Sequence, residues 1–212
     1  IRRWRPRPGC ASATCAAAPW PTCSMPRPRA SSFNSISINC PTMSTIDAEA
    51  LYRVLLDQIR AAYGTAFAEP GGPRLAGIHS GGAWLAERLA RDLGAPAFGV
   101  VNVALHRDDY AKKGLHSQAS PTSLPFEIDG ARIVLVDDVL FTGRTVRAAL
   151  NELFDYGRPA AVELAVLADR GGRELPVAAR FAGGALDVPA GATLVLARDD
   201  AQFTLRVEAH GA

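Results

Sequence analysis

The sequence has no cysteine after residue 40 and no acidic residue before residue 47. The cysteine-free remainder argues against a disulfide framework or a metal–thiolate site there. The chain also lacks an apolar run long enough for a secretory signal core or a membrane span. Six of its 23 basic residues lie in the acid-free segment 1–42, so residues 43–212 carry 17 basic and 21 acidic residues, a net charge of −4.

Residues 1–42 show no hydrophobic periodicity and hold seven of the fifteen prolines. Their composition cannot build a core. The arginines and serines formally fit an organellar transit peptide, but the prolines argue against the amphipathic helix that such a peptide needs. We favour the interpretation that Met43 is the true start and that 1–42 is upstream sequence translated by mistake. A functional disordered arm is the alternative. Either way we expect one folded domain over 43–209.

Alternating strand and helix patterns predict the fold class. Four branched apolar residues, 133–136, indicate a strand buried on both faces, as in a parallel sheet. A long polar connection over 106–125 predicts a functional lid or disorder. We therefore expect a parallel-sheet α/β domain flanked by helices, with a small hood from the terminal segments. The predicted helices lie between Asp47 and Gly64 (apolar positions Leu51, Val54, Leu55 and Ile59), at 83–93 and at 145–156; the predicted strands lie at 75–79, 98–105, 133–136 and 161–168, with short strands in 177–208.

Two adjacent carboxylates, Asp137 and Asp138, come where the buried strand should end. In an open α/β sheet, ligands bind at the carboxyl ends of the strands. Adjacent carboxylates can accept hydrogen bonds from a vicinal diol, directly or with the help of a hard cation. A hydroxyl-bearing turn, Thr142 to Thr145, then leads into a helix whose first N–H groups suit a phosphate. A diol beside a phosphate indicates a ribose 5-phosphate.

A receiver domain or a simple capping role fits this stretch less well. Response-regulator receiver domains carry a similar pair of acids, but after their first strand, whereas this pair lies almost a hundred residues beyond Met43. A buried strand whose acids only cap the next helix would account for one carboxylate but not for the pair with a glycine turn.

The stretch from Val134 to Thr145 resembles the 5-phosphoribosyl-1-pyrophosphate (PRPP) signature of type I phosphoribosyltransferases. The resemblance extends over nearly everything after Met43 and is closest to the PyrR family of bifunctional pyrimidine-operon regulators and uracil phosphoribosyltransferases. Supporting blocks lie at 85–90, 105–109 and 168–176.

The resemblance implies a role for each part of the site. Asp137 and Asp138 would hold the ribose hydroxyls, and would meet Mg²⁺ directly or indirectly. Arg107 would belong to a mobile loop that closes over the leaving group; a solvated surface arginine is the equal alternative. The implied PRPP-binding residues are Val139, Leu140, Phe141, Thr142, Gly143, Arg144 and Thr145; the pyrophosphate loop is Ser80, Gly81 and Gly82; the base-facing loop is Asp169, Arg170 and Gly171.

The resemblance further implies formation of UMP from uracil and PRPP, in a cytoplasmic, dimer-based assembly with no membrane partner. One departure stands out, because Gly81 occupies a position where the family usually has an arginine, and loss of that cation should weaken pyrophosphate binding. Two alternatives stay open: an RNA-binding regulator with weak or no catalysis, and a transferase for another base. A leader-RNA site would need a basic patch from Arg147, Arg158, Arg170, Arg173 and Arg180, and scattered solvated arginines are the equal alternative.

Overall fold

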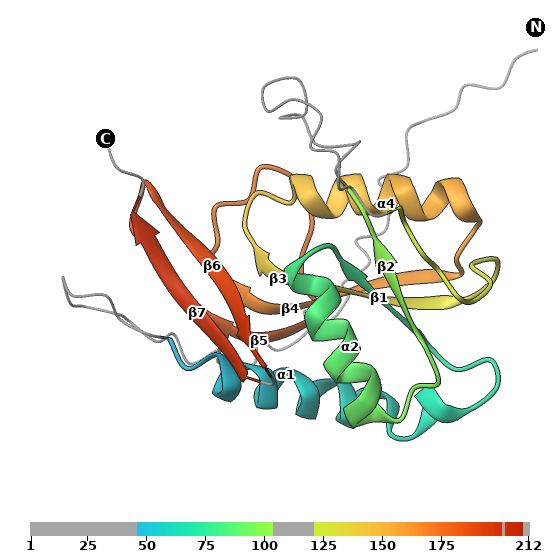
Figure 1. Ribbon diagram of the computed structural model, residues 1–212. Helices are drawn as coiled ribbons and strands as arrows, with labels where there is room; N and C mark the ends of the chain where they lie inside the picture. The colour runs from blue at the N-terminus through green and yellow to red at the C-terminus, as the bar shows by residue number, and fades with distance from the viewer. Residues whose placement is uncertain (1–45, 104–120, 201, 210–212) are drawn as a thin grey trace, which may run out of the picture. The chain divides into compact units, whose positions relative to one another are not determined.

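The computed structural model describes residues 46–103, 121–200 and 202–209. A parallel sheet of five strands, in the order β2-β1-β3-β4-β5, forms its centre. Helices α1 and α2 cover one face of the sheet, and α4 covers the other (Figure 1). The elements are α1 (Ala48–Tyr63), the 3₁₀ turn η1 (Ala66–Ala68), β1 (Arg74–Ile78), α2 (Gly81–Leu93), β2 (Phe98–Val101), β3 (Arg132–Leu140), α4 (Arg144–Tyr156), β4 (Ala161–Asp169), β5 (Phe181–Ala185), β6 (Ala192–Asp199) and β7 (Gln202–Ala209).

The central strand β3 is buried on both faces, as predicted. Residues 133–136 have no exposed surface. Val134 and Val136 pack toward α1 and α2, whereas Ile133 and Leu135 pack toward α4. This alternation is the two-residue period of a strand lying between two helical layers.

Helix α1 begins and ends where the sequence predicts. The carboxylate of Asp47 accepts a hydrogen bond from the Ala50 N–H at 2.9 Å, and Gly64 follows the last turn. One detail of its predicted face is wrong: Val54 is 46% exposed. Tyr52 and Leu56 are buried instead, because α1 packs under both the sheet and β7 and so buries a wider face.

Helix α2 begins at Gly81, two residues earlier than predicted, because its two glycines let the backbone approach the sheet. A Cβ on Gly82 would overlap the carbonyl oxygen of Val136 and lie 3.0 Å from the Asp137 Cα. A Cβ on Gly77 of β1 would in turn overlap the Gly82 carbonyl oxygen. The first turn of α2 therefore lies directly against the ends of β1 and β3.

Strands β6 and β7 form the predicted hood, an antiparallel hairpin separate from the main sheet (Figure 1). Ile46 forms a bridge with Leu205, so both terminal segments contribute to it. Glu49 of α1 joins the hood to α2, since its carboxylate accepts hydrogen bonds from Arg88 at 2.7 and 2.8 Å and from the Phe203 N–H at 2.9 Å. The pKa of Glu49 lies below its ordinary value, above all because of the Arg88 hydrogen bond.

Two further boundaries differ from prediction. Strand β2 ends at Val101, and Thr122 and Ser123 return beside it. Between α1 and β1, where the sequence predicts neither a helix nor a strand, η1 buries Phe67 completely. None of the helices in the described ranges is long and apolar enough to cross a bilayer. The predictions for residues 1–42, Arg107 and most of the 106–125 connection lie outside the described residues.

Candidate active site

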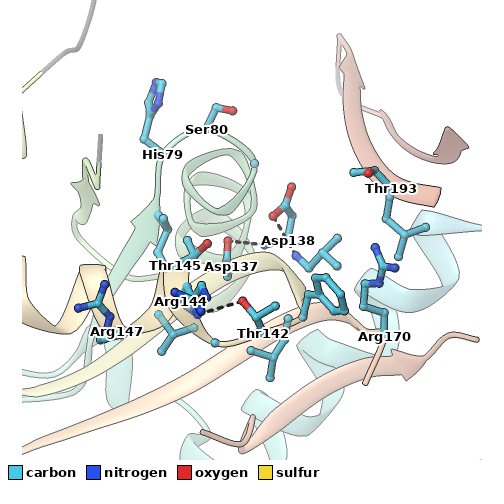
Figure 2. A pocket seen from close by; sticks show the side chains of 18 residues that line it. His79, Ser80, Asp137, Asp138, Thr142, Arg144, Thr145, Arg147, Arg170 and Thr193 are labelled. Carbon is cyan, nitrogen blue, oxygen red and sulfur yellow. Dashed lines mark hydrogen bonds between the residues drawn. The ribbon is translucent and has the colours of Figure 1, made fainter. Parts of the chain in front are cut away.

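A cavity of about 500 Å³ opens at the carboxyl ends of β1 and β3 (Figure 2). Its walls are the ends of these strands, the first turns of α2 and α4, Arg170 after β4, and the start of β6. The lining residues are Ile78, His79, Ser80, Gly81, Asp137, Asp138, Val139, Leu140, Phe141, Thr142, Gly143, Arg144, Thr145, Val146, Arg147, Arg170, Thr193 and Leu194.

Asp137 and Asp138 lie within β3 rather than after it. Pairing with β1 stops at Val136, but pairing with the longer β4 continues to Leu140. Asp138 is skipped in the register with β4. At this break the Asp138 N–H donates to the Asp137 carboxylate at 3.0 Å, and the Val139 N–H donates to the Asp138 carboxylate at 2.8 Å.

These hydrogen bonds fix the orientation of both acids. Asp137 is only 5% exposed and is the one buried charged side chain within the described residues. A carboxylate can accept several hydrogen bonds, and both acids line the cavity. The pair can therefore receive two neighbouring hydroxyl groups from one ligand.

The turn over residues 141–145, named the phosphate loop below after the ligand predicted for it, follows β3 and leads into α4. Gly143 adopts φ +90°, and a Cβ there would overlap Val177 and lie 3.3 Å from the Leu175 Cβ. The Thr142 hydroxyl accepts a hydrogen bond from the Arg144 N–H at 3.3 Å. The backbone N–H groups of Thr142, Gly143 and Thr145 have no acceptor within the described part of the chain. Unsatisfied donors at a helix N-terminus suit an anion.

The predicted pyrophosphate loop contributes Ser80 and Gly81 to the cavity, but not Gly82, which lies in the first turn of α2 against Val136 and Asp137 of β3. The peptide bond between His79 and Ser80 is cis. Asp138 lies directly over Gly81: a Cβ on that glycine would overlap its carboxylate and lie 2.9 Å from its Cβ. This contact gives a local reason for the glycine.

Of the predicted base-facing loop, 169–171, only Arg170 reaches the cavity. Its guanidinium lies 4.0 Å from the centre of the Phe141 ring and donates to the Ala192 carbonyl at 3.0 Å. The Arg170 Nε is buried and has no hydrogen-bond partner among the described residues. Asp169 does not line the cavity, because its carboxylate accepts from the Gly171 N–H at 2.9 Å and pairs with Arg173 at 2.5 Å.

Sequence reasoning missed several lining residues. Thr193 and Leu194 come from the hood, and no local pattern in their sequence indicates where the hairpin lies. Arg147 could have been found, because it follows Arg144 by three residues and so lies on the same face of α4. The remaining missed residues are Ile78, His79 and Val146.

The basic patch suggested by five arginines does not form as one surface. Arg147 and Arg170 line the cavity at the carboxyl ends of the strands. Arg158 and Arg180 precede β4 and β5 and so lie at the opposite edge of the sheet, where Arg180 pairs with Glu163. Arg173 turns toward backbone carbonyls beside the cavity.

Comparison with known proteins shows which family the chain resembles. The family model "Phosphoribosyl transferase domain" matches residues 49–186. The bifunctional protein PyrR of Ralstonia nicotianae is 59% identical over 171 residues, 79% of this chain and 97% of that protein. The bifunctional protein PyrR of Nitrosococcus oceani is 44% identical over 173 residues, with 80% and 97% covered.

Solved structures support the fold independently of close sequence similarity. The hypoxanthine phosphoribosyltransferase of Trypanosoma cruzi matches with a TM-score of 0.52 at 18% identity, over 77% of this chain and 95% of that one. At this identity the match concerns the fold alone, and it confirms the predicted type I phosphoribosyltransferase architecture.

Proposed function

Because the chain belongs to the PyrR family of phosphoribosyltransferases, we propose that its cavity forms UMP and pyrophosphate from uracil and PRPP. Membership confirms the resemblance predicted from the sequence, and with it the assignment as an enzyme. One observation supports the site proposal most directly. A fixed carboxylate pair and a helix N-terminus whose N–H donors lack acceptors among the described residues line the same cavity.

The two features match the two ends of a ribose 5-phosphate. Asp137 and Asp138 hold the 2- and 3-hydroxyls, and the phosphate loop holds the 5-phosphate through its N–H groups and the Thr142 and Thr145 hydroxyls. Arg144 and Arg147 add positive charge at the same wall of the cavity. Both ends of the sugar phosphate are then fixed, which orients its anomeric carbon.

The donor set suits Mg²⁺ bound together with PRPP. The described residues contain no cluster of three or more His, Cys, Asp or Glu side chains that could form an all-protein metal cage. Mg²⁺ is often held by one or two carboxylates plus substrate oxygens and water, and Asp137 and Asp138 can supply the carboxylates. When bound, the ion would neutralise charge that develops on the departing pyrophosphate.

In the proposed reaction, a uracil ring nitrogen forms a bond to the anomeric carbon as the bond to the pyrophosphate oxygen breaks. The uracil nitrogen loses its proton, and pyrophosphate leaves with the bonding electron pair. The anomeric carbon passes through cationic character, so the protein must position both partners and exclude water. The predicted lid containing Arg107 would complete this exclusion.

In this proposal, the uracil base binds in the part of the cavity next to Arg170. Arg170 is fixed between the Phe141 ring and the hood carbonyl of Ala192. The family assignment favours uracil, and a fixed guanidinium can donate to a carbonyl oxygen of the base. Orotate or a purine base is the alternative that an activity screen decides.

A second function follows from the family: regulation of pyrimidine-operon transcription through leader RNA, in response to UMP. The two matched relatives are named bifunctional proteins. We propose that this chain retains the activity as a homodimer in the cytoplasm, where PRPP and nascent RNA occur. Gel shifts with its own leader RNA at low salt, with and without UMP, test it; no binding in either condition would reject the regulatory proposal.

The enzyme proposal is tested with the full chain, Mg²⁺ and PRPP, supplied in turn with uracil, orotate, hypoxanthine and guanine. We expect UMP from uracil and little product from the other bases. Arg206→Met, on the exposed surface of β7, serves as a matched control that should keep parental activity. No UMP from the parent protein would overturn the assignment.

A further inference from the structure

Arg173 lies behind the cavity wall and has no part in the reaction described above. We propose that Arg173 is a positioning residue that holds the phosphate loop in its anion-binding conformation. The inference rests on the proposed ribose-phosphate site, and it assigns to Arg173 a role that acts through backbone rather than on the ligand.

The guanidinium of Arg173 joins the two loops that flank the cavity. On one side it pairs with Asp169 at 2.5 Å and donates to the Gly171 carbonyl at 3.1 Å. On the other side its Nη1 donates to the carbonyls of Leu140 and Phe141, at 3.2 and 2.7 Å. Its Nε donates to the Val177 carbonyl at 3.2 Å. The charge is therefore met by backbone carbonyls and one carboxylate.

The residues after Arg173 extend the same contact. The N–H groups of Glu174 and Leu175 both donate to the Thr142 carbonyl, at 3.0 and 3.1 Å. The Glu174 carboxylate pairs with Arg144 at 2.7 Å. Val177 packs against Gly143, where a side chain would not fit. The segment 173–177 thus forms a support beneath the phosphate loop.

These contacts determine where the donors of the phosphate loop point. The carbonyls of Leu140, Phe141 and Thr142 all face the supporting segment. In a trans peptide the N–H points opposite to the C=O. The N–H groups of the next residues, including Thr142 and Gly143, consequently point away from the support and have no acceptor in the described chain. Loss of Arg173 would release the Phe141 carbonyl and with it the peptide that presents the Thr142 N–H, whereas the Leu140 carbonyl would keep the Arg170 N–H at 3.1 Å.

An arginine at this position could instead serve as a surface contact for RNA. Its side chain is 23% exposed, and all three of its nitrogens donate to protein acceptors. A direct RNA contact would need those hydrogen bonds to break. The geometry therefore favours a role inside the protein.

The test compares Arg173→Met, Arg173→Lys and the control Arg206→Met in the full chain. Calorimetry with ribose 5-phosphate measures how tightly the site with the phosphate loop binds a sugar phosphate, without turnover and without the base. We expect Arg173→Met to weaken binding by about ten- to a hundredfold, the range for lost hydrogen bonds to a charged group. Arg173→Lys should fall in between, because it keeps the charge with fewer donors in fixed positions. Arg206→Met should match the parent.

Hydrogen exchange supplies a readout that needs no ligand. Peptides covering 138–146 should exchange faster in Arg173→Met, while peptides covering β1 keep the parental rate. Parental affinity and exchange in Arg173→Met, or equally faster exchange in both regions, would overturn the proposal. If Arg173→Met does not fold, parental behaviour of Arg173→Lys in both measurements overturns it. If the parent binds no ribose 5-phosphate, the proposed function fails, and exchange still decides the role of Arg173.

Discussion

Two helix N-termini face the same cavity, and they differ in the groups that they present to an anion. The first turn of α4 brings Thr142, Thr145 and two arginines to the cavity, and its loop N–H groups lack acceptors within the described chain. The first turn of α2 offers only Ser80 and Gly81, and the Asp138 carboxylate lies against Gly81. The α4 end is preformed for an anion, whereas the α2 end meets a negative charge and needs a cation from elsewhere.

The comparison gives a physical reason for a glycine at position 81. A cationic side chain at this position would begin with a Cβ that overlaps the Asp138 carboxylate. In this conformation, any side chain at position 81 would require the Asp138 carboxylate to move. Under the proposed function, the protein itself holds the sugar phosphate, and the leaving group depends more on Mg²⁺ and on the predicted lid.

The largest expected effect comes from neutralising the carboxylates with Asp137→Asn and Asp138→Asn together. We expect UMP formation to fall by about a hundred- to a thousandfold or more, since preorganised charge at the reacting sugar is lost. The amide oxygens can still accept the N–H groups of Asp138 and Val139, so the melting temperature should stay close to that of the parent. Initial rates and thermal melting measure both quantities. Activity within tenfold of the parent would contradict the assigned role.

The preformed α4 end can be broken with Gly143→Ala. The left-handed φ and the overlap with Val177 both oppose a side chain, and we expect a loss of about 1–3 kcal/mol in unfolding free energy, with a raised KM for PRPP. Gly130→Ala is the matched control, because Gly130 has φ +69° but no atom within 4 Å of its Cβ position. That variant should lose stability without a change in KM. Equal KM values in the two variants would contradict the proposed role of the phosphate loop in binding PRPP.

The bare α2 end can be probed with Gly81→Ala. The added methyl group should push Asp138 from its hydrogen bond with Val139 and raise the KM for PRPP by about tenfold, as overpacking typically costs 1–3 kcal/mol. Product inhibition by pyrophosphate should not weaken, because the carboxylate no longer covers the α2 terminus. Steady-state kinetics with added pyrophosphate measures both. A parallel loss of pyrophosphate inhibition would reject this account of Gly81.

The smallest effect concerns the link between α2 and the hood. Because the folded pKa of Glu49 is depressed, mainly by Arg88, its stabilising contribution is present above the unfolded value of 4.5 and is lost as pH falls through the folded pKa. Glu49→Gln should lower the melting temperature by a few degrees at pH 7, and flatten the decline below pH 4.5. Melting curves between neutral and acid pH test this. An unchanged acid slope would show that Glu49 is not linked to stability.

The sequence predicted most of what lies along β3 and its turn, because those features are local. A buried apolar run, two acids, hydroxyls and a glycine stand within thirteen residues, and their chemistry can be read from residue type. The role of Arg173 could not be predicted, since it depends on the backbone carbonyls of Leu140 and Phe141, which are distant in sequence. Thr193 and Leu194 were missed for a similar reason: packing of the hood places them, and no motif marks them.

The break in the β3 ladder has a consequence for how selection can act on the chain. The carboxylates of Asp137 and Asp138 accept hydrogen bonds from the backbone N–H groups of Asp138 and Val139 there. A lineage that gave up catalysis would still gain from an acceptor at each position, because an apolar side chain there would lose a hydrogen bond to the backbone. Retained acids in a relative are therefore weak evidence that it still turns over substrate, whereas an asparagine pair would be a clear sign of lost chemistry in a preserved fold.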